Sequence, residues 1–245
     1  MIKNDQHFMV DTELLTKISS LVKKRLIFEI GPGKGALTNL LLDKASNLVI
    51  VEKDLALIPV LNKRFLKEIE EGKLQVINEN VLDLSLKKYA DFEMISNLPY
   101  SISEPFFYKI IKEGIKKIIL VTGKDFYENL LKEKKLGLYC SIFFNLKKHF
   151  EIRPSSFRPE PRVDSVCFTL ERKESTIFSD IFSQTDKKLY NALLVSFSLN
   201  RTKNEARFLI DSLKIPEALL KKRISHLSNF QFLQIFSILK KKQFN

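Results

Sequence analysis

Short apolar runs alternate with amphipathic segments through the first half of the chain. The apolar runs cover residues 26–30, 47–51, 73–77, 92–95 and 117–121. Apolar residues at helical spacing occupy residues 11–22, 36–42, 55–70 and 105–112. Runs this short are typical of buried strands, and strands that alternate with helices form a parallel sheet with helices on both faces. The alternation therefore predicts an α/β fold with a doubly wound, mostly parallel sheet.

The pattern changes after residue 121. We expect a helix over residues 126–133 and an antiparallel edge strand over residues 163–170, where apolar and polar residues alternate. Residues 172–175 are polar and mark a boundary, and apolar residues at helical spacing then occupy 189–199, 205–213, 216–224 and 230–239. The sequence thus predicts a first domain over residues 1–174 and a small all-helical domain over residues 175–245.

The chain carries a large and unevenly distributed positive charge. Lys and Arg number 41 against 29 Asp and Glu, which gives a net charge of +12. Residues 172–245 hold 14 basic and 6 acidic residues, so 14 − 6 = +8 of this charge lies in the C-terminal part. Such an excess favours a polyanionic partner, nucleic acid first and an acidic membrane surface second. A lysine-rich surface can also serve solubility alone.

Several classes of site and location are disfavoured by the sequence. The two cysteines, Cys140 and Cys167, lie far apart in apolar surroundings and are expected to be buried, reduced thiols. The three histidines show no ligand spacing. Residues 1–5 open no secretory signal, and no apolar run reaches the roughly 18 residues of a membrane-spanning helix. We expect a cytoplasmic monomer that binds no metal and no membrane.

Three glycines separate the first predicted strand from the helix that follows it. Gly31, Gly33 and Gly35 lie between residues 26–30 and 36–42. Glycine permits positive φ and lets a ligand approach the backbone closely, and the helix N-terminus behind it offers oriented N–H groups. The spacing is not that of the dinucleotide fingerprint, and such a turn can also serve close packing alone.

Polar residues or a glycine follow four successive predicted strands. Gly31, Glu52, Asp83 and Asn97 occupy these positions. The carboxyl ends of parallel strands meet at one edge of the sheet, where such folds bind their ligands. Glu52 lies where an acid of a doubly wound fold accepts hydrogen bonds from both ribose hydroxyls, and Asp83 is suited to accept from an adenine amine. The pattern predicts a nucleoside-binding crevice.

The sequence Asn97-Leu98-Pro99-Tyr100 suits a site that holds an exocyclic amine. The Asn97 side-chain oxygen and the Leu98 carbonyl can each accept one N–H, which directs the nitrogen lone pair away from the ring of the base. Pro99 stiffens the loop, and Tyr100 offers a ring face for a flat base. Taken alone, these residues could also be a strand-end turn capped by asparagine.

Together these residues resemble the S-adenosylmethionine-dependent rRNA adenine N6,N6-dimethyltransferases, the KsgA family. The resemblance spans roughly the first 170 residues and rests on Gln6-His7-Phe8-Met9, residues 29–38, Glu52 with Asp54, Asp83, residues 97–103 and residues 159–165. It implies a Rossmann-like methyltransferase fold with S-adenosylmethionine as the cofactor. The implied cofactor contacts are His7, Met9, Gly31, Gly33, Glu52, Asp83 and Asn97.

The resemblance also implies a substrate and a reaction. Asn97, Leu98, Pro99 and Tyr100 would be the catalytic residues that hold the target adenine. Further substrate contacts would come from Phe157, as a second stacking face, and from Arg201 and Lys203, which match the basic helix start of the family only loosely. The implied activity is direct dimethylation of N6 of a flipped-out adenine in small-subunit ribosomal RNA during ribosome maturation. The partner would be that RNA or its precursor particle.

Other functions are compatible with parts of this pattern. The nearest rival is the Erm type, which methylates the same atom in large-subunit rRNA and confers antibiotic resistance, although Pro32 and Val163-Asp164-Ser165 favour the KsgA type. A nicotinamide dehydrogenase would use the same strand-end acid, but the glycine spacing argues against it. A module that only binds RNA would not need Glu52, Asp83 and Asn97 together.

Overall fold

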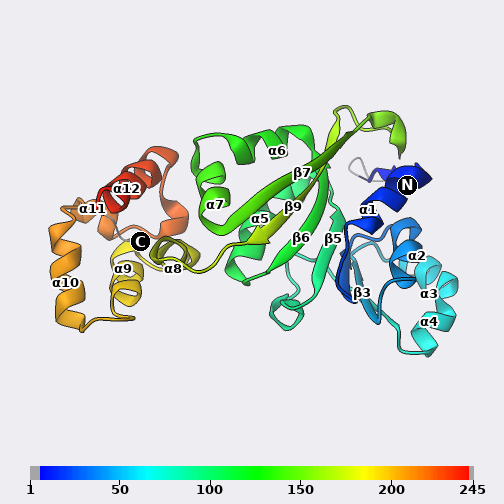
Figure 1. Cartoon of the computed structure of the whole chain (residues 1–245), viewed down its shortest axis with the longest axis horizontal. Coiled ribbons are helices and arrows are strands. Elements are labelled where there is room, and N and C mark those ends of the chain that lie inside the picture. The colour runs from blue at the N-terminus through cyan, green and yellow to red at the C-terminus, as the bar shows by residue number, and fades with distance from the viewer. Residues whose placement is uncertain (1–5, 243–245) are drawn as a thin grey trace. The chain divides into compact units, whose positions relative to one another are not determined.

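A computed structural model describes residues 6–242 of the chain (Figure 1). The chain divides into two compact units, the first formed by Met1–Glu128 and Asn145–Arg172 and the second by Asn129–Phe144 and Lys173–Asn245. The second unit therefore includes an earlier segment that the sequence placed in the first domain. Residues 1–5, on which the expectation of no secretory signal rested, lie outside the described residues.

The first unit is built on a seven-stranded sheet in the order β4-β3-β2-β5-β6-β9-β7. The strands are β1 (Phe8–Met9), β2 (Leu26–Ile30), β3 (Asn47–Glu52), β4 (Leu74–Asn78), β5 (Glu93–Asn97), β6 (Lys117–Gly123), β7 (Phe144–Ile152), β8 (Phe157–Arg158) and β9 (Ser165–Arg172). The strands from β4 to β6 pair in parallel, β9 is antiparallel to β6, and β1 pairs with β8 in a separate two-stranded sheet. The predicted doubly wound, mostly parallel sheet is confirmed.

The antiparallel strand predicted over residues 163–170 is present as β9, but its predicted position at the edge of the sheet is wrong. β9 lies between β6 and β7, so β7 is the edge strand. Residues Ser165 to Leu170 are all buried, whereas β7 is half exposed along its length. A strand that is covered on both faces of the sheet has a nearly continuous apolar sequence, whereas a half-exposed strand alternates apolar and polar residues. Residues 165–170 are closer to the continuous apolar pattern.

Helices account for most of the rest of the chain. They are α1 (Thr12–Ser20), α2 (Ala36–Leu42), α3 (Ile58–Arg64), α4 (Leu66–Glu70), α5 (Ser103–Lys112), α6 (Lys124–Leu131), α7 (Lys135–Phe143), α8 (Ile177–Ser183), α9 (Leu189–Phe197), α10 (Lys203–Ser212), α11 (Glu217–Leu220) and α12 (Asn229–Lys241). Short 3-10 turns are η1 (Lys87–Tyr89), η2 (Tyr100–Ile102), η3 (Pro154–Ser156) and η4 (Ile224–His226). The helices α7 and α8 are additions to the sequence-based prediction.

The helix predicted over residues 55–70 is divided at Phe65. Pro59 lies in the first turn of α3, as expected, but Phe65 leaves helical geometry with φ −118° and ψ 30°. Its ring is almost completely buried and lies directly against Gly35. Burial of this large ring beneath the glycine turn therefore accompanies the break between α3 and α4.

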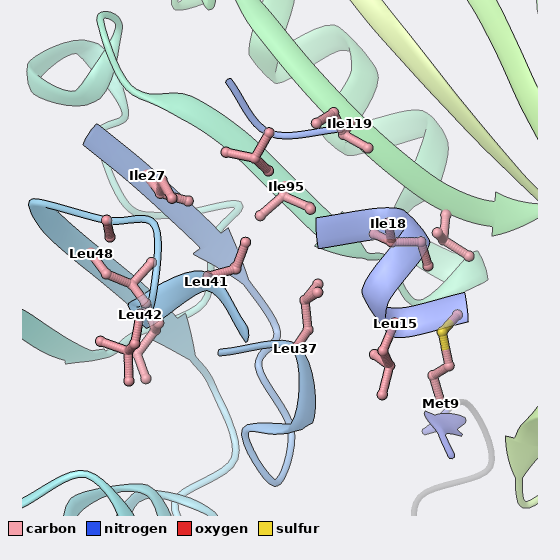
Figure 2. Packing of buried hydrophobic residues seen from close by; sticks show 14 of the residues in the cluster. Met9, Leu15, Ile18, Ile27, Leu37, Leu41, Leu42, Leu48, Ile95 and Ile119 are labelled. Atoms are coloured by element: carbon pink, nitrogen blue, oxygen red, sulfur yellow. The ribbon is translucent and has the colours of Figure 1, made fainter. Parts of the chain in front are cut away.

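Apolar side chains of α1 and α2 pack against one face of the sheet. Figure 2 shows Leu15 and Ile18 of α1 and Leu37 and Leu41 of α2 in one buried cluster with strand residues that include Ile95. Leu41 and Ile95 are fully buried. Because such a close-packed core resists displacement, it fixes the turns that follow β2 and β5 on the sheet.

The second unit is all-helical, as the sequence predicts for its C-terminal part, and α7 is integrated into it. The Tyr139 ring stacks on Phe232 of α12, with centroids 4.8 Å apart and planes inclined by 25°. Lys135 Nζ donates to the Leu227 carbonyl at 2.9 Å. Aromatic packing and this hydrogen bond tie the apolar helix 135–143 to the C-terminal helices, which explains why the unit begins before residue 175.

The structure gives direct information on cysteines, metals and membranes. Both Cys140 and Cys167 are free and buried, and burial raises the pKa of each thiol to about 12. Among residues 6–242, no group of three His, Cys, Asp or Glu side chains is placed to hold a metal ion. No helix in this range combines the length and the apolar character that a bilayer crossing requires.

Gly35→Ala is expected to destabilise the fold strongly. Gly35 has φ +81°, and an added Cβ would lie 2.5 Å from a Phe65 ring atom, so the substitution adds both backbone strain and overpacking. We expect a loss of about 2–5 kcal/mol in the free energy of unfolding, measured by urea denaturation. Gly72→Ala is the matched control, since Gly72 has φ +70° but nothing within 4 Å of the added atom. Equal losses for both variants would contradict this account.

Candidate functional site

A cavity of about 750 Å³ lies at the carboxyl ends of β2, β3, β4 and β5. Small-molecule sites typically have volumes of roughly 300–1,000 Å³. Its walls are the glycine turn 31–34, the end of β3, residues 79–81, the loop 97–100 and the N-terminal segment 6–10. Strand ends that are far apart in the sequence thus meet at one place, as the strand-end pattern predicts.

The glycine turn serves two purposes at different positions. Gly31 has φ +66°, lines the cavity and has no atom within 4 Å of the place where a Cβ would lie. Gly33 has φ +58°, and a Cβ there would meet the Phe8 ring at 2.8 Å. Gly31 therefore leaves open backbone that a ligand can approach, whereas Gly33 and Gly35 permit close packing of aromatic rings.

Glu52 is buried at the end of β3 with its carboxylate fixed by backbone amides. Oε1 accepts from the Asp54 amide at 2.9 Å, and Oε2 accepts from the Gly33 amide at 3.3 Å. Burial raises the pKa of Glu52, and these two amides act in the opposite direction. A carboxylate can accept about four hydrogen bonds, so Glu52 keeps acceptor capacity for a diol that enters the cavity.

At the end of β4, Asn80 and not Asp83 lines the cavity. Asp83 is exposed, and its Oδ2 accepts from Asn80 Nδ2 at 3.0 Å. The Leu82 amide donates to Asn80 Oδ1 at 3.1 Å, so the whole Asn80 amide is oriented. The direct cofactor contact predicted for Asp83 is not supported by its position. Asn80 was missed, although its place directly after the strand was visible in the sequence.

The side chain of Asn97 is oriented by the N-terminal segment. Its Nδ2 donates to the His7 carbonyl at 3.0 Å. Because a carbonyl oxygen only accepts, the nitrogen must face His7, and Oδ1 is the acceptor at the other end of the amide. The Leu98 amide donates to the Val121 carbonyl at 2.9 Å, which fixes the loop on β6. Asn97, Leu98, Pro99 and Tyr100 all line the cavity.

The ring of Tyr100 is held by the neighbouring strand ends. Its hydroxyl lies 2.6 Å from Ser165 Oγ, and its ring atoms lie 3.4 Å from the place where Gly123 would carry a Cβ. Gly123 and Ser165 pair with each other across β6 and β9. The His7 ring stacks beside Tyr100, with centroids 5.8 Å apart and planes inclined by 27°. These contacts position a half-buried aromatic ring at the cavity.

The N-terminal segment supplies His7 and Met9 to the cavity lining. His7 Nδ1 lies 2.8 Å from the Pro159 carbonyl, so Nδ1 carries a proton and donates. Met9 pairs with Phe157 across β1 and β8. Phe157 is fully buried in the hydrophobic cluster and does not line the cavity, so the predicted second stacking face is not supported. Its ring fills the core beneath Met9, and His7 is the ring beside Tyr100.

Glu29 is a buried acid in the cavity wall. The sequence did not predict its burial or its raised pKa. Glu29 is 2% exposed, and Thr38 Oγ1 donates to its Oε2 at 2.6 Å. Burial raises the pKa of Glu29 to about 8, against the effect of the Thr38 hydrogen bond and with a further contribution from the charge of Glu52. Glu29 therefore holds a proton at neutral pH.

The basic residues Arg201 and Lys203 lie in the second unit: Lys203 is the first residue of α10, and Arg201 directly precedes its N-cap, Thr202. Both are exposed. Neither forms an ion pair with another residue of the described range 6–242. Both side chains are accessible to an external anion, although the charge of Arg201 also acts on Glu205.

Glu29→Gln is expected to change how stability depends on pH. The folded state holds the Glu29 proton more tightly than the unfolded chain, whose pKa is near the usual 4.5. The contribution of this group to the free energy of unfolding therefore falls as pH rises from about 4.5 to about 8, by ~1.4 kcal/mol per pH unit. Wild type should lose stability relative to the glutamine variant across that window, measured by denaturant unfolding at each pH.

Glu93→Gln is the matched control for this titration. Glu93 is also buried, but its ion pair with Lys117 at 2.6 Å and the amides of Lys24 and Lys23 hold its pKa below the usual value despite burial. Its contribution is fully present above the usual pKa and is lost only as pH falls through the folded value. This variant should be less stable by a constant amount across the same window. A pH-independent difference for Glu29→Gln would contradict the assignment.

Comparison with known proteins places this chain in a family. The family described as ribosomal RNA adenine dimethylase matches residues 2–241. A ribosomal RNA small subunit methyltransferase A of Mycoplasmopsis pulmonis is 31% identical over 206 residues, 80% of this chain and 78% of that protein. A dimethyladenosine transferase from Plasmodium falciparum has a similar crystal structure, with a TM-score of 0.66 and 26% identity over 97% of this chain and 99% of that chain.

A further solved structure shares only the fold. The 23S rRNA methyltransferase ErmE superposes with a TM-score of 0.57 and 18% identity, over 95% of this chain and 99% of that chain. The family match covers nearly the whole chain. This chain belongs to the ribosomal RNA adenine dimethylase family.

Proposed function

We propose that this protein transfers two methyl groups from S-adenosylmethionine to N6 of an adenine in small-subunit ribosomal RNA. One observation carries the chemical part of the proposal. The Asn97 amide is oriented with its nitrogen on the His7 carbonyl, so its oxygen is the acceptor that remains at the cavity, beside the Tyr100 ring. The family and the small-subunit relatives support the choice of substrate.

The cavity has the donor and acceptor groups that an S-adenosylmethionine site requires. Glu52 would accept hydrogen bonds from the ribose hydroxyls, and the open backbone at Gly31 leaves room for the cofactor. His7 and Met9 would close the cavity from the N-terminal segment. When bound, the cofactor supplies an electrophilic methyl group on its sulfonium.

Asn80 would read the adenine ring of the cofactor. Its amide uses one N–H for Asp83 and one oxygen lone pair for the Leu82 amide, so one donor and one acceptor remain. An amide with one of each can pair with the edge of adenine, accepting from the amine and donating to a ring nitrogen. In this proposal Asp83 acts indirectly, because it holds the Asn80 amide in one orientation.

The target adenine needs activation because the lone pair of its N6 is shared with the ring. Asn97 Oδ1 and the Leu98 carbonyl would accept the two N–H groups and favour a pyramidal nitrogen, while Tyr100 stacks on the flipped-out base. Alignment of this nitrogen with the methyl group can contribute up to roughly 7–11 kcal/mol. The nitrogen loses its proton after transfer, so no strong general base is required. In the second transfer the substrate is N6-methyladenine, which has one N–H left on N6, so only one of the two acceptors is used.

The second unit would bind the RNA backbone. Arg201 and Lys203 are exposed and without ion-pair partners in the described range, and the C-terminal part carries most of the net charge. The partner would be the small ribosomal subunit or its precursor particle, met by a monomeric enzyme in the cytoplasm.

Asn97→Ala is expected to lower kcat by about 10²–10³-fold at saturating cofactor, because an oriented hydrogen-bond partner of the reacting group is lost. Methyl transfer to small subunits that lack these methyl groups is the measurement. Asn80→Ala is the control for cofactor binding: it should raise the Kd of S-adenosylmethionine, measured by calorimetry, and leave kcat near wild type. Wild-type kcat in Asn97→Ala would remove the loop from the chemistry.

Replacing Arg201 and Lys203 together by alanine should weaken subunit binding and flatten its salt dependence. Each phosphate contact contributes about 0.7–0.9 to the slope of log Kd against log salt concentration, so we expect the slope to fall by about 1.4–1.8. Binding to unmethylated small subunits across a KCl series is the measurement. The control is Lys240→Ala with Lys241→Ala, which removes the same charge at the end of α12. Equal effects would mean that the charge acts diffusely.

A further inference from the structure

Phe208 presents an aromatic ring to solvent in the middle of a basic segment. It is 74% exposed, and among the phenylalanines of residues 6–242 only Phe208 and Phe230 are exposed. The other phenylalanines of this range are buried or half-buried. A single exposed apolar side chain is normal on a protein surface, so this ring is informative only together with its surroundings.

The helix geometry keeps Phe208 away from the core of its own unit. α10 buries Ala206 and Ile210, which lie two residues on either side of Phe208. A step of two residues turns an α-helix by about 200°, so Phe208 points away from the buried side. Rotating α10 to bury this ring would expose Ala206 and Ile210. The ring is therefore available only to an external partner.

The surroundings of Phe208 indicate an anionic partner. Lys203 and Arg207 are one helical turn apart on the same line of α10, Arg207 adjoins Phe208, and Arg201 precedes the helix. All three cations are exposed and have no ion-pair partner in residues 6–242. Two acids, Glu205 and Asp211, lie on the same helix, and Glu205 accepts from the Thr202 amide and hydroxyl in the helix cap while it also feels the charge of Arg201. The surface combines an exposed aromatic ring with more basic than acidic side chains.

We propose that Phe208 stacks on an unpaired base of the ribosomal RNA while Arg201, Lys203 and Arg207 bind the adjacent phosphates. Aromatic rings flanked by basic residues bind single-stranded RNA in this way, because every base has a π-face and every linkage has a charge. This inference rests on the proposed function, since it requires an RNA substrate. It adds a stacking contact outside the cavity that holds the methylated adenine.

The chain contains no tryptophan, which makes a direct test possible. Phe208→Trp introduces a single indole, and stacking on a base should quench its emission when unmethylated small ribosomal subunits are added. Phe230→Trp is the matched control, because Phe230 is 75% exposed on α12 and that helix carries no charged residue before Lys240. Quenching at position 208 but not at 230 is expected. Equal quenching at both positions, or none at 208, would overturn the proposal.

Kinetics give a second test in the same assay. Phe208→Ala should raise the KM for small subunits by about 5- to 150-fold and leave kcat unchanged, whereas Phe208→Tyr should retain wild-type KM. Phe208→Leu keeps apolar bulk without a π-face, so a wild-type KM in that variant would contradict stacking. A blue shift of the Phe208→Trp emission with anionic phospholipid vesicles, and none of these effects with subunits, would indicate a membrane surface instead.

The failure of this inference can be told apart from failure of the proposed function. All variants are compared with wild-type enzyme that methylates the same subunits. If wild type transfers no methyl groups to them, the proposed function fails. If wild type is active and the Phe208 variants behave as the Phe230 control, only the stacking contact is wrong.

Discussion

Parallel pairing of β4, β3, β2 and β5 is the constraint on which the site depends. In a parallel sheet every strand ends at the same edge, so residues far apart in the sequence are brought together without any direct attraction between them. Gly31, Glu52, Asn80 and Asn97 follow or end these strands and line one cavity. A buried cluster of α1, α2 and strand residues packs against the sheet next to this edge. The strand order of the sheet brings the cavity residues together, and local contacts then orient their side chains.

The N-terminal segment completes what the strand ends leave open. Gln6 donates to Asp54 beside Glu52, Phe8 packs on Gly33, and His7 contacts Pro159, Asn97 and Tyr100. One short segment therefore touches the end of β3 beside Glu52, the glycine turn and the loop that we propose holds the target base. Its contacts orient the Asn97 amide, which the strand alone could not do. In the proposed function, the groups assigned to the cofactor and those assigned to the substrate are all contacted by this one segment.

The sequence predicts features that depend on local spacing and fails where packing decides. The strands, the glycine turn, Glu52 and the loop 97–100 are recognisable because their position after an apolar run places them at the sheet edge. Asp83 and Asn80 compete for the same role, and only the turn after β4 shows that Asn80 faces the cavity while Asp83 orients it. Phe157 is drawn into the core by its pairing with Met9. The spacing of apolar residues in the sequence does not show which of these side chains faces the cavity and which faces the core.

The two units also differ in how much of their function can be inferred from residue order. Methyl transfer needs short, directional contacts, so its residues occupy fixed positions that a pattern reveals, and the cavity lining belongs to the first unit. Binding of an RNA backbone needs positive charge in the right region but tolerates many arrangements of it. Composition therefore indicates the charge of the second unit without naming its contact residues. Exposure in the folded state supplies that missing information, because it separates Phe208 from the many phenylalanines that only fill a core.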